Sequence, residues 1–472
     1  MRLGARRNAA LHHAARIVED AWASFDEARP TEPLLSETVM ALLHESLPTR
    51  GTDPIAALDE AHLVLEHSLA QSRPRFLAYV GSSGLEIGAV GDLLAHSYDV
   101  NLALDARAAT LLEQQTVGWL ADFLGYPAAT GWFTSGGTVS NLNALVAARE
   151  LAVPGVRSAG VTSTRLVLYC SAEAHYSVKR AAEILGIGSS GVRQIPVSKA
   201  GRALRVDLLE EAIVRDRAAA ITPIAVVATA GTTLTGAVDP IDEMADVCAR
   251  HGIWLHVDGA YGVPAAATSR SALFEGLARA DSVAVDAHKW LFVPKACSVL
   301  LVRQPSSFIA ALGHDEAYVP HDGDVPNSVD VTLEYSRPLR ALKLWLAFRV
   351  HGAAEMTAAV EANLAQADYC YDVADGHPEL EVLPVRPPLS IVPVRHVIPG
   401  CPDTDEHNSR LAEAIQRDGS SYVSPATIDD GQWLRPCFTN IRTTSGDVDA
   451  FLGSVVRIGR EICPEHSGQR RV

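Results

Sequence analysis

The spacing of apolar residues predicts regions of different structure along the chain. In residues 1–75, apolar residues recur at helical intervals in "NAALHHAARIVEDAWASF" and "PIAALDEAHLVLEHSLAQ", a pattern typical of amphipathic helices. From about residue 88 to 305, long helical stretches alternate with short runs of apolar and β-branched residues. These runs predict strands at residues 165–171, 224–231, 253–261, 282–290 and 297–303.

Strands that alternate with helices predict an α/β fold, in which helices cover both faces of a mostly parallel sheet. Ligands of such sheets bind beyond the carboxyl ends of the strands. Residues 306–340 are rich in Gly, Pro, Asp and His and predict a long loop with a functional role. We therefore expect an N-terminal helical dimerisation segment (1–85), a large α/β domain (86–345) and a small α+β C-terminal domain (346–472).

Composition narrows the class of protein. The formal net charge of −16 argues against binding to nucleic acid or to an anionic membrane surface. No apolar run is long enough to span a membrane, and the N-terminus lacks the apolar core of a secretory signal. The seven cysteines are scattered and include no C-x-x-C pair, which predicts reduced thiols in the cytoplasm and no structural metal site.

Lysine is rare in this chain. Of the 40 basic residues, five are lysine and the others are arginine. Arginine stays protonated, whereas a lysine amine can lose its proton and attack a carbonyl group. Each remaining lysine is therefore a candidate nucleophile, and Lys289 in "VDAHKWLFVPK" (285–295) is notable because it is predicted to end an apolar strand. The alternative is a surface lysine at a strand end.

Two motifs stand where a helix is predicted to begin. "FTSGGTVSN" (133–141) places a glycine turn before a helix, and the free N–H groups of a helix N-terminus suit a phosphate. The candidate residues are Ser135, Gly136, Gly137 and Thr138, and the alternative is an ordinary helix cap. In "SAEAHYSVKR" (171–180), His175 could stack on a planar cofactor, or it could be a capping or partly buried histidine.

Asp258 in "HVDGAYG" (256–262) closes a predicted strand. A buried carboxylate needs a partner, and a protonated heterocyclic nitrogen would serve; a helix cap or a loop contact is the alternative. Lys289 follows about one strand–helix–strand unit later, so both side chains could reach the same crevice.

Together the motifs match the chemical demands of pyridoxal 5′-phosphate (PLP). Lys289 would form a Schiff base with its aldehyde, and Asp258 would keep the ring nitrogen protonated, which makes the ring an electron sink. The turn at 135–138 would hold the phosphate, and His288 could add a contact to it. His175 would cover the face of the ring.

The chain resembles the group II PLP-dependent amino-acid decarboxylases. The resemblance rests on "TSGGTVSNLNAL", "AEAHYSVKRAAEILGIG", "HVDGAYG", "DAHKW" and "RALKLWLAFRVHG", over roughly residues 70–350. It implies fold type I, a homodimer with the active site at the interface, and the roles above for Lys289, Asp258 and His175. It adds Thr229 and Ala260 near the cofactor, and supports Ser135, Gly137, Thr138 and His288 near the phosphate.

The resemblance also implies the reaction, in which an L-amino acid loses CO2 and yields an amine. In the family, a loop from the neighbouring subunit brings a tyrosine to the substrate as proton donor, and "HDEAYVPHDGD" places that tyrosine at Tyr318. Relatives that form aldehydes by oxidative deamination typically carry phenylalanine there, so Tyr318 favours the amine. The sequence is also compatible with a different fold-type-I lyase, with an aminotransferase and with a catalytically inactive relative.

The substrate is the least determined part of this prediction. Family regions that line the side-chain pocket match Tyr79, Val80, Ser82, Val100 and Leu102. They are mostly apolar, which favours an aromatic substrate first, an aliphatic one second and an acidic one third. Arg442 could hold a carboxylate, or it could form a structural salt bridge.

Overall fold

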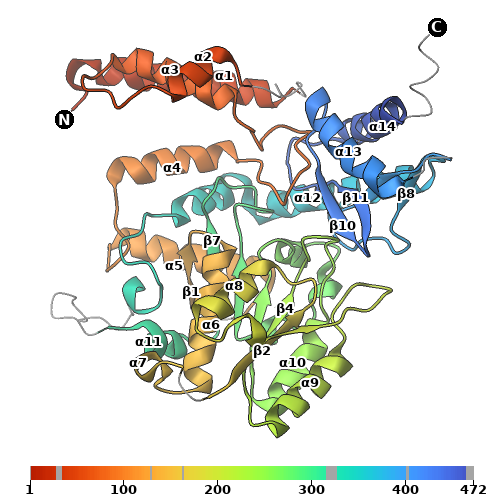
Figure 1. The fold of residues 1–472 in the computed structure, drawn as a ribbon. Helices are drawn as coiled ribbons and strands as arrows, with labels where there is room; N and C mark the ends of the chain where they lie inside the picture. Colours follow the sequence, from red (N-terminus) through yellow and green to blue (C-terminus); the bar gives the residue numbers. More distant parts are fainter. Residues whose placement is uncertain are drawn as a thin grey trace. The chain divides into compact units, whose positions relative to one another are not determined.

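The computed structural model describes residues 2–27, 35–127, 130–161, 164–314, 327–399 and 403–463 (Figure 1). The chain divides into two compact units, each described by itself below. The large unit comprises Gly84–Ala365 and Pro384–Ile391, and the small unit comprises Met1–Ser83, Gln366–Leu383 and Val392–Val472. Among the described residues, no helix is both long and apolar enough to cross a membrane.

The large unit contains a sheet of seven strands over its described residues, in the order β1-β7-β6-β5-β4-β2-β3. The strands are β1 (Thr130–Thr134), β2 (Leu166–Ser171), β3 (Val192–Ile195), β4 (Thr222–Thr229), β5 (Trp254–Asp258), β6 (Ser282–Val285) and β7 (Ser298–Val302). Strands β3, β2, β4, β5 and β6 are parallel to one another, and β7 is antiparallel to both β6 and β1. The prediction of a mostly parallel sheet is therefore confirmed.

The five predicted strands correspond to β2, β4, β5, β6 and β7. The sequence did not reveal β1 and β3, which lie at the two edges of the sheet. Both are short, and part of each remains accessible to solvent. An edge strand needs less apolar surface than a central one, so its sequence carries a weaker signal.

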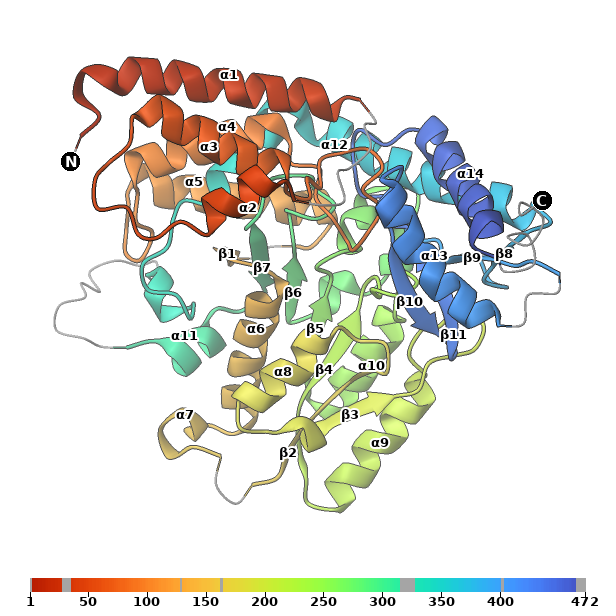
Figure 2. The same ribbon diagram turned by 45° about the horizontal axis from the view of Figure 1, so that its top comes forward.

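Helices flank the sheet on the large unit. They are α4 (Glu86–Tyr98), α5 (Ala108–Leu124), α6 (Gly137–Ala152), α7 (Val156–Ala159), α8 (Tyr176–Ile184), α9 (Val206–Ala218), α10 (Ile241–His251) and α11 (Ser306–Leu312). Helix α6 packs against β4, β5, β6 and β7, and it lies beside α8 (Figure 2). Its small buried residues, such as Ala144 and Ala147, allow this close approach. The long α12 (Ala341–Asp375) is interrupted at Gly352, where φ is 73°.

One detail of the strand prediction is wrong. Strand β6 ends at Val285, so Lys289 does not end a strand but lies in the turn that follows it. The backbone N–H of Lys289 donates to the Asp286 carbonyl (2.9 Å), and that of Phe292 donates to the Lys289 carbonyl (3.2 Å). The apolar run continues past Val285 because the turn is also buried, and burial rather than strand structure produced the pattern.

The small unit combines N-terminal helices with an antiparallel sheet. Its helices are α1 (Arg7–Phe25), α2 (Glu37–Leu43), α3 (Pro54–Glu66), α13 (Thr404–Asp418) and α14 (Ser445–Ile462). The strands β8 (Leu380–Val382), β9 (Val394–His396), β10 (Ser424–Ile428) and β11 (Gly431–Arg435) pair in the order β10-β11-β9-β8. The predicted helices of the first 75 residues are confirmed as α1 and α3.

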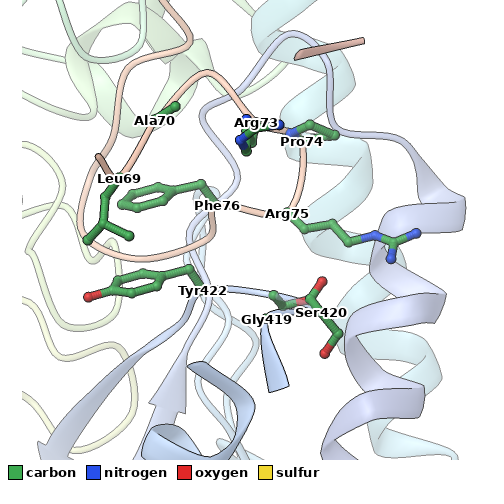
Figure 3. A pocket seen from close by; sticks show the side chains of 10 residues that line it. Leu69, Ala70, Arg73, Pro74, Arg75, Phe76, Gly419, Ser420 and Tyr422 are labelled. Atoms are coloured by element: carbon green, nitrogen blue, oxygen red, sulfur yellow. The ribbon is translucent and has the colours of Figure 1, made fainter. Parts of the chain in front are cut away.

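A small cavity in this unit lies beside two stacked aromatic rings (Figure 3). The rings of Phe76 and Tyr422 are 5.1 Å apart and nearly parallel. The cavity volume is ≈ 10 Å³, which is room for about one water molecule. It is too small for an amino-acid substrate.

Candidate active site

Three neighbouring parallel strands bring the predicted site residues together. Thr229 ends β4 and is paired with Asp258, which ends β5. Asp258 is in turn paired with Ala284 of β6, just before the turn that carries Lys289. The carboxyl ends of parallel strands meet at one edge of the sheet, which is where an α/β sheet binds its ligand.

The Lys289 amine is held by a carboxylate in its own turn. Its Nζ lies 3.0 Å from Asp286 Oδ2, and the lysine side chain is 25% exposed while that of Asp286 is 3% exposed. Burial acts to raise the pKa of Asp286, but the nearby Lys289 and His288 outweigh it and hold the pKa below its usual range. The amine is thus partly accessible and oriented, and it becomes a nucleophile when it gives up its proton.

Asp258 is buried and receives two N–H donors. Asn141 Nδ2 donates to its Oδ2 over 2.8 Å, and the backbone N–H of Ala260 donates to its Oδ1 over 3.3 Å. The sequence predicted that a carboxylate here would need a partner. Asn141 is one such partner. Because its amide carries no charge, the carboxylate can still pair with a cationic ring.

His175 is the N-cap residue of α8, as in the alternative of a capping histidine, and its side chain takes part in the cap. Its Nδ1 accepts from the backbone N–H of Ser177 (3.3 Å) and is 2.9 Å from Ser177 Oγ. Burial lowers the pKa of His175, with Asp258 acting in the opposite direction. The ring is thereby anchored by one edge and kept neutral near neutral pH, which suits a stacking role.

The glycine turn lies against the same group of residues. A Cβ atom at Gly137 would be 3.0 Å from the Ala260 Cβ and 3.0 Å from Asp286 Oδ2, and one at Gly136 would be 4.0 Å from His288 Cε1. The turn from Ser135 to Thr138 thus adjoins Ala260 and His288 at the start of α6. The first N–H groups of a helix attract an anion.

His288 is fixed by the strand that follows it. The Cys297 carbonyl accepts from the His288 backbone N–H (3.1 Å). The His288 Nδ1 lies 2.9 Å from the same carbonyl oxygen and 3.2 Å from the Cys297 backbone nitrogen. Burial lowers the pKa of His288, with Asp286 opposing. These contacts hold the His288 ring beside the glycine turn, where it could contact a phosphate.

These residues fit PLP. Thr229 Oγ1 is buried and has no hydrogen-bond partner among the described residues, which is unusual for a folded protein unless a ligand supplies one. Lys289 could bond the aldehyde, Asp258 could face the ring nitrogen, and the turn at 135–138 could take the phosphate. A bound PLP would supply an electron sink for breaking a bond at the substrate Cα.

The remaining predicted residues are Tyr318 and the candidates for the substrate side-chain pocket. Tyr318 lies outside the described residues. Val100 and Leu102 belong to the large unit, where Leu102 is 2% exposed and its backbone N–H donates to the Arg337 carbonyl (3.0 Å).

Tyr79, Val80 and Ser82 belong to the small unit, where Tyr79 has φ 58° and is 54% exposed. In the same unit, Arg442 binds Asp26 (3.1 Å) and the Ser83 carbonyl (3.1 Å). These contacts match the alternative in which Arg442 forms a structural salt bridge.

Sequence reasoning missed three polar residues of the site: Asn141, His256 and Asp286. Each lies inside a motif that was recognised for a neighbouring residue. A signal for His256 was present, because a histidine in the middle of the apolar run "IWLHVDGAY" (253–261) must be buried with hydrogen-bond partners. Asn141 and Asp286 had no comparable signal, since polar residues are common at turns and helix starts.

Comparison with known proteins extends over nearly the whole chain. The Bacillus atrophaeus aromatic-L-amino-acid decarboxylase is 31% identical over 446 residues, covering 92% of this chain and 91% of the relative. The L-2,4-diaminobutyrate decarboxylase of Rhizobium meliloti (strain 1021) is 31% identical over 441 residues, covering 90% and 86%. Among solved structures, Oryza sativa TDC with PLP and tryptamine superposes with a TM-score of 0.91 at 26% identity, covering 98% and 99% of the two chains.

The model of the pyridoxal-dependent decarboxylase conserved domain matches residues 36–392. This match covers the glycine turn, His175, Asp258 and the Lys289 turn. The fold is accordingly that of the fold-type-I PLP enzymes, as the sequence predicted. The chain belongs to the pyridoxal-dependent decarboxylase family and is a PLP-dependent amino-acid decarboxylase.

Proposed function

We propose that this protein decarboxylates an aromatic or bulky apolar L-amino acid to the corresponding amine and CO2. The observation that carries the assignment of the reactive group is the position of Lys289, whose amine lies 3.0 Å from a buried carboxylate just beyond the parallel strands. The substrate preference is supported by the apolar character of Val80, Val100 and Leu102. It is also supported by the likeness to the Bacillus atrophaeus aromatic-L-amino-acid decarboxylase.

Each site residue has a distinct role in this proposal. Lys289 attaches the cofactor covalently, and Asp286 holds its amine in place until attachment. Asp258 pairs with the ring nitrogen, while His175 covers the ring face and Thr229 and Ala260 lie along its edge. Ser135, Gly136, Gly137, Thr138 and His288 hold the phosphate.

Tyr318 donates the proton that replaces CO2 at the substrate Cα. In this proposal it comes from the neighbouring subunit of a homodimer, so each active site is built from two chains. Tyr79, Val80, Ser82, Val100 and Leu102 line the side-chain pocket of the assembled site. The protein works in the cytoplasm, where thiols stay reduced, and the six described cysteines are all buried.

A product screen tests the reaction and the substrate together. The PLP-loaded protein is incubated with a panel of L-amino acids labelled with 13C at the carboxyl group, and CO2, amine, aldehyde and hydrogen peroxide are measured. We expect CO2 with an equal amount of amine from aromatic substrates. CO2 from 2,4-diaminobutyrate or an acidic substrate alone would overturn the preference, and aldehyde with peroxide would replace simple decarboxylation by oxidative deamination.

Two lysine variants provide a matched comparison for the cofactor-bearing residue. Lys289→Ala should lose the absorbance of the lysine-bound cofactor and all CO2 release. Lys295→Ala removes an amine from the same segment and should keep both. A Lys289→Ala protein in which borohydride still fixes the cofactor to a lysine would contradict the assignment.

Tyr318→Phe tests the proton donor. In the presence of O2, the variant should shift the product from amine toward aldehyde, ammonia and hydrogen peroxide, because the substrate Cα is no longer protonated efficiently and O2 acts as the oxidant instead. An unchanged amine yield would remove Tyr318 from this role.

A further inference from the structure

A chain of buried hydrogen bonds extends from Asp258 into the core of the large unit. Asn141 Nδ2 donates to Asp258 Oδ2 (2.8 Å), and Asn141 Oδ1 lies 2.9 Å from His256 Nε2. His256 Nδ1 lies 2.8 Å from Ser282 Oγ, which accepts from the indole N–H of Trp254 over 3.0 Å. Asn141 is 1% exposed, and His256 and Ser282 are 0% exposed, so no solvent can substitute for any of these partners.

The carboxylate of Asp258 determines the direction of every bond in this chain. An ionised carboxylate only accepts, so the amide of Asn141 must present its NH2 group to Asp258 and its oxygen to His256. That oxygen only accepts, so His256 must carry a proton on Nε2. Burial lowers the pKa of His256 to about 4 and outweighs Asp258 and a hydrogen bond to the Ser282 backbone, which act to raise it, so the ring is neutral. With its single proton on Nε2, the ring presents Nδ1 as an acceptor. Ser282 then donates its hydroxyl proton to Nδ1.

A second branch leads from the same amide to His175. Asn141 Nδ2 also donates to Ser177 Oγ over 3.0 Å. Ser177 is 0% exposed, and its hydroxyl proton therefore points to the remaining near neighbour, His175 Nδ1, at 2.9 Å. The backbone N–H of Ser177 donates to the same nitrogen. His175 Nδ1 accepts twice, so the neutral ring carries its proton on Nε2.

We propose that Asn141 and His256 are positioning residues of the active site. His256 orients the amide of Asn141, and that one amide holds the carboxylate of Asp258 and, through Ser177, fixes His175 as the tautomer protonated on Nε2. The role for catalysis rests on the proposed function, in which Asp258 pairs with the cofactor ring and His175 covers it. The hydrogen-bond directions themselves are a property of the protein without cofactor.

The arrangement links two groups that must act on the same cofactor. If the Asn141 amide turned over, its oxygen would face Asp258, and the carboxylate would lose a donor and face a repulsive lone pair. The same rotation would withdraw the donor from Ser177, and the His175 tautomer would no longer be determined. His256 prevents this because its Nε2 proton is matched only by the amide oxygen.

Nitrogen NMR of the full-length protein, labelled with 15N in histidine, tests the directions. The spectrum distinguishes a protonated from a bare ring nitrogen, and the signals are assigned by their loss in His256→Gln and His175→Gln. We expect both rings to be neutral, with the proton on Nε2, in the protein without PLP. A proton on Nδ1 of either ring would overturn the proposal, whether or not the protein proves to be a decarboxylase.

PLP affinity, measured by fluorescence titration, tests the consequence. Loss of a hydrogen bond to a charged group corresponds to a change in affinity of roughly 10- to 100-fold. Asn141→Ala and His256→Leu should weaken PLP binding by that factor and lower kcat more than they raise KM. His256→Gln keeps an N–H donor that reaches Asn141, and it should recover most of the affinity.

Tyr126→Phe is the matched control. It removes a buried hydrogen bond of the same unit, from the Tyr126 hydroxyl to the Ala280 carbonyl (2.8 Å), and it should leave PLP affinity unchanged. Asn141→Ala and His256→Leu proteins that bind PLP as tightly as this control would refute the positioning role. If those variants do not fold, the NMR spectrum of the unaltered protein still decides the proposal. Failure of the unaltered protein to bind PLP would instead refute the proposed function.

Discussion

Gly137 offers a sharp test of the packing behind the proposed phosphate site. A methyl group there would lie 3.0 Å from the Ala260 Cβ and 3.0 Å from Asp286 Oδ2, closer than ordinary van der Waals contact. Alanine in place of glycine in a helix interior gains about 1 kcal/mol, and less in the first turn. Overpacking a tight site costs about 1–3 kcal/mol. The cost exceeds the gain, so Gly137→Ala should lower the free energy of unfolding by about 1 kcal/mol.

The same substitution should disturb cofactor binding, because Ala260 and Asp286 are the residues that have to move. We expect PLP affinity to fall by about 10-fold, the equivalent of 1.4 kcal/mol. Gly118→Ala is the control, since Gly118 lies inside α5 and a Cβ there would meet nothing within 4 Å. That variant should gain about 0.5–1 kcal/mol of stability and bind PLP normally.

Urea unfolding and fluorescence titration with PLP measure both quantities in both variants. The reasoning would be refuted if Gly137→Ala gained stability as Gly118→Ala does and bound PLP with unchanged affinity. Such a result would mean that position 137 has room for a side chain, and that Ala260 and Asp286 do not pack against the glycine turn.

Other substitutions follow from buried polar groups. Thr229→Val should raise the free energy of unfolding of the cofactor-free protein by about 1 kcal/mol, because Oγ1 lacks a partner among the described residues. The same substitution should weaken PLP binding, and an unchanged PLP affinity in a fluorescence titration would argue against a contact between Thr229 and the cofactor. Arg337→Met should lower the free energy of unfolding by about 3–5 kcal/mol, measured with urea, because it leaves the buried Glu113 carboxylate without its ion-pair partner. The double variant Arg337→Met with Glu113→Leu should recover most of that stability, and a double variant as unstable as the single one would contradict this reasoning. Burial lowers the pKa of His256 from 6.5 to about 4. The free energy of unfolding is therefore not reduced by His256 above pH 6.5, and it falls by up to roughly 3 kcal/mol as the pH drops to about 4, because the unfolded chain binds the proton first. His256→Gln should flatten that part of the stability profile, and an unchanged slope would show that another group is responsible.

The extent to which the sequence predicted the site follows from where its residues lie in the chain. Asp258 and His175 stand at the end of a strand or the start of a helix, where the period of the apolar pattern changes, whereas Thr229 was implied only by the resemblance to the family. Such positions can be read from one sequence because a polar residue interrupts an apolar run at the point where the chain leaves the sheet. Lys289 was recognised for its chemistry and motif, although it lies in the turn after the strand and not at the end of the strand.

Asn141, His256 and Asp286 illustrate why the rest was not predicted. Their importance lies in contacts between residues far apart in sequence, such as the 2.9 Å contact between Asn141 and His256. Local pattern reports whether a side chain is buried, but not which polar group it meets once helix α6 packs on the sheet. A buried histidine in a central strand therefore predicts that a partner exists, and only the packed structure identifies that partner as the amide that also holds Asp258. The residues that orient a catalytic group are for this reason harder to predict than the catalytic group itself.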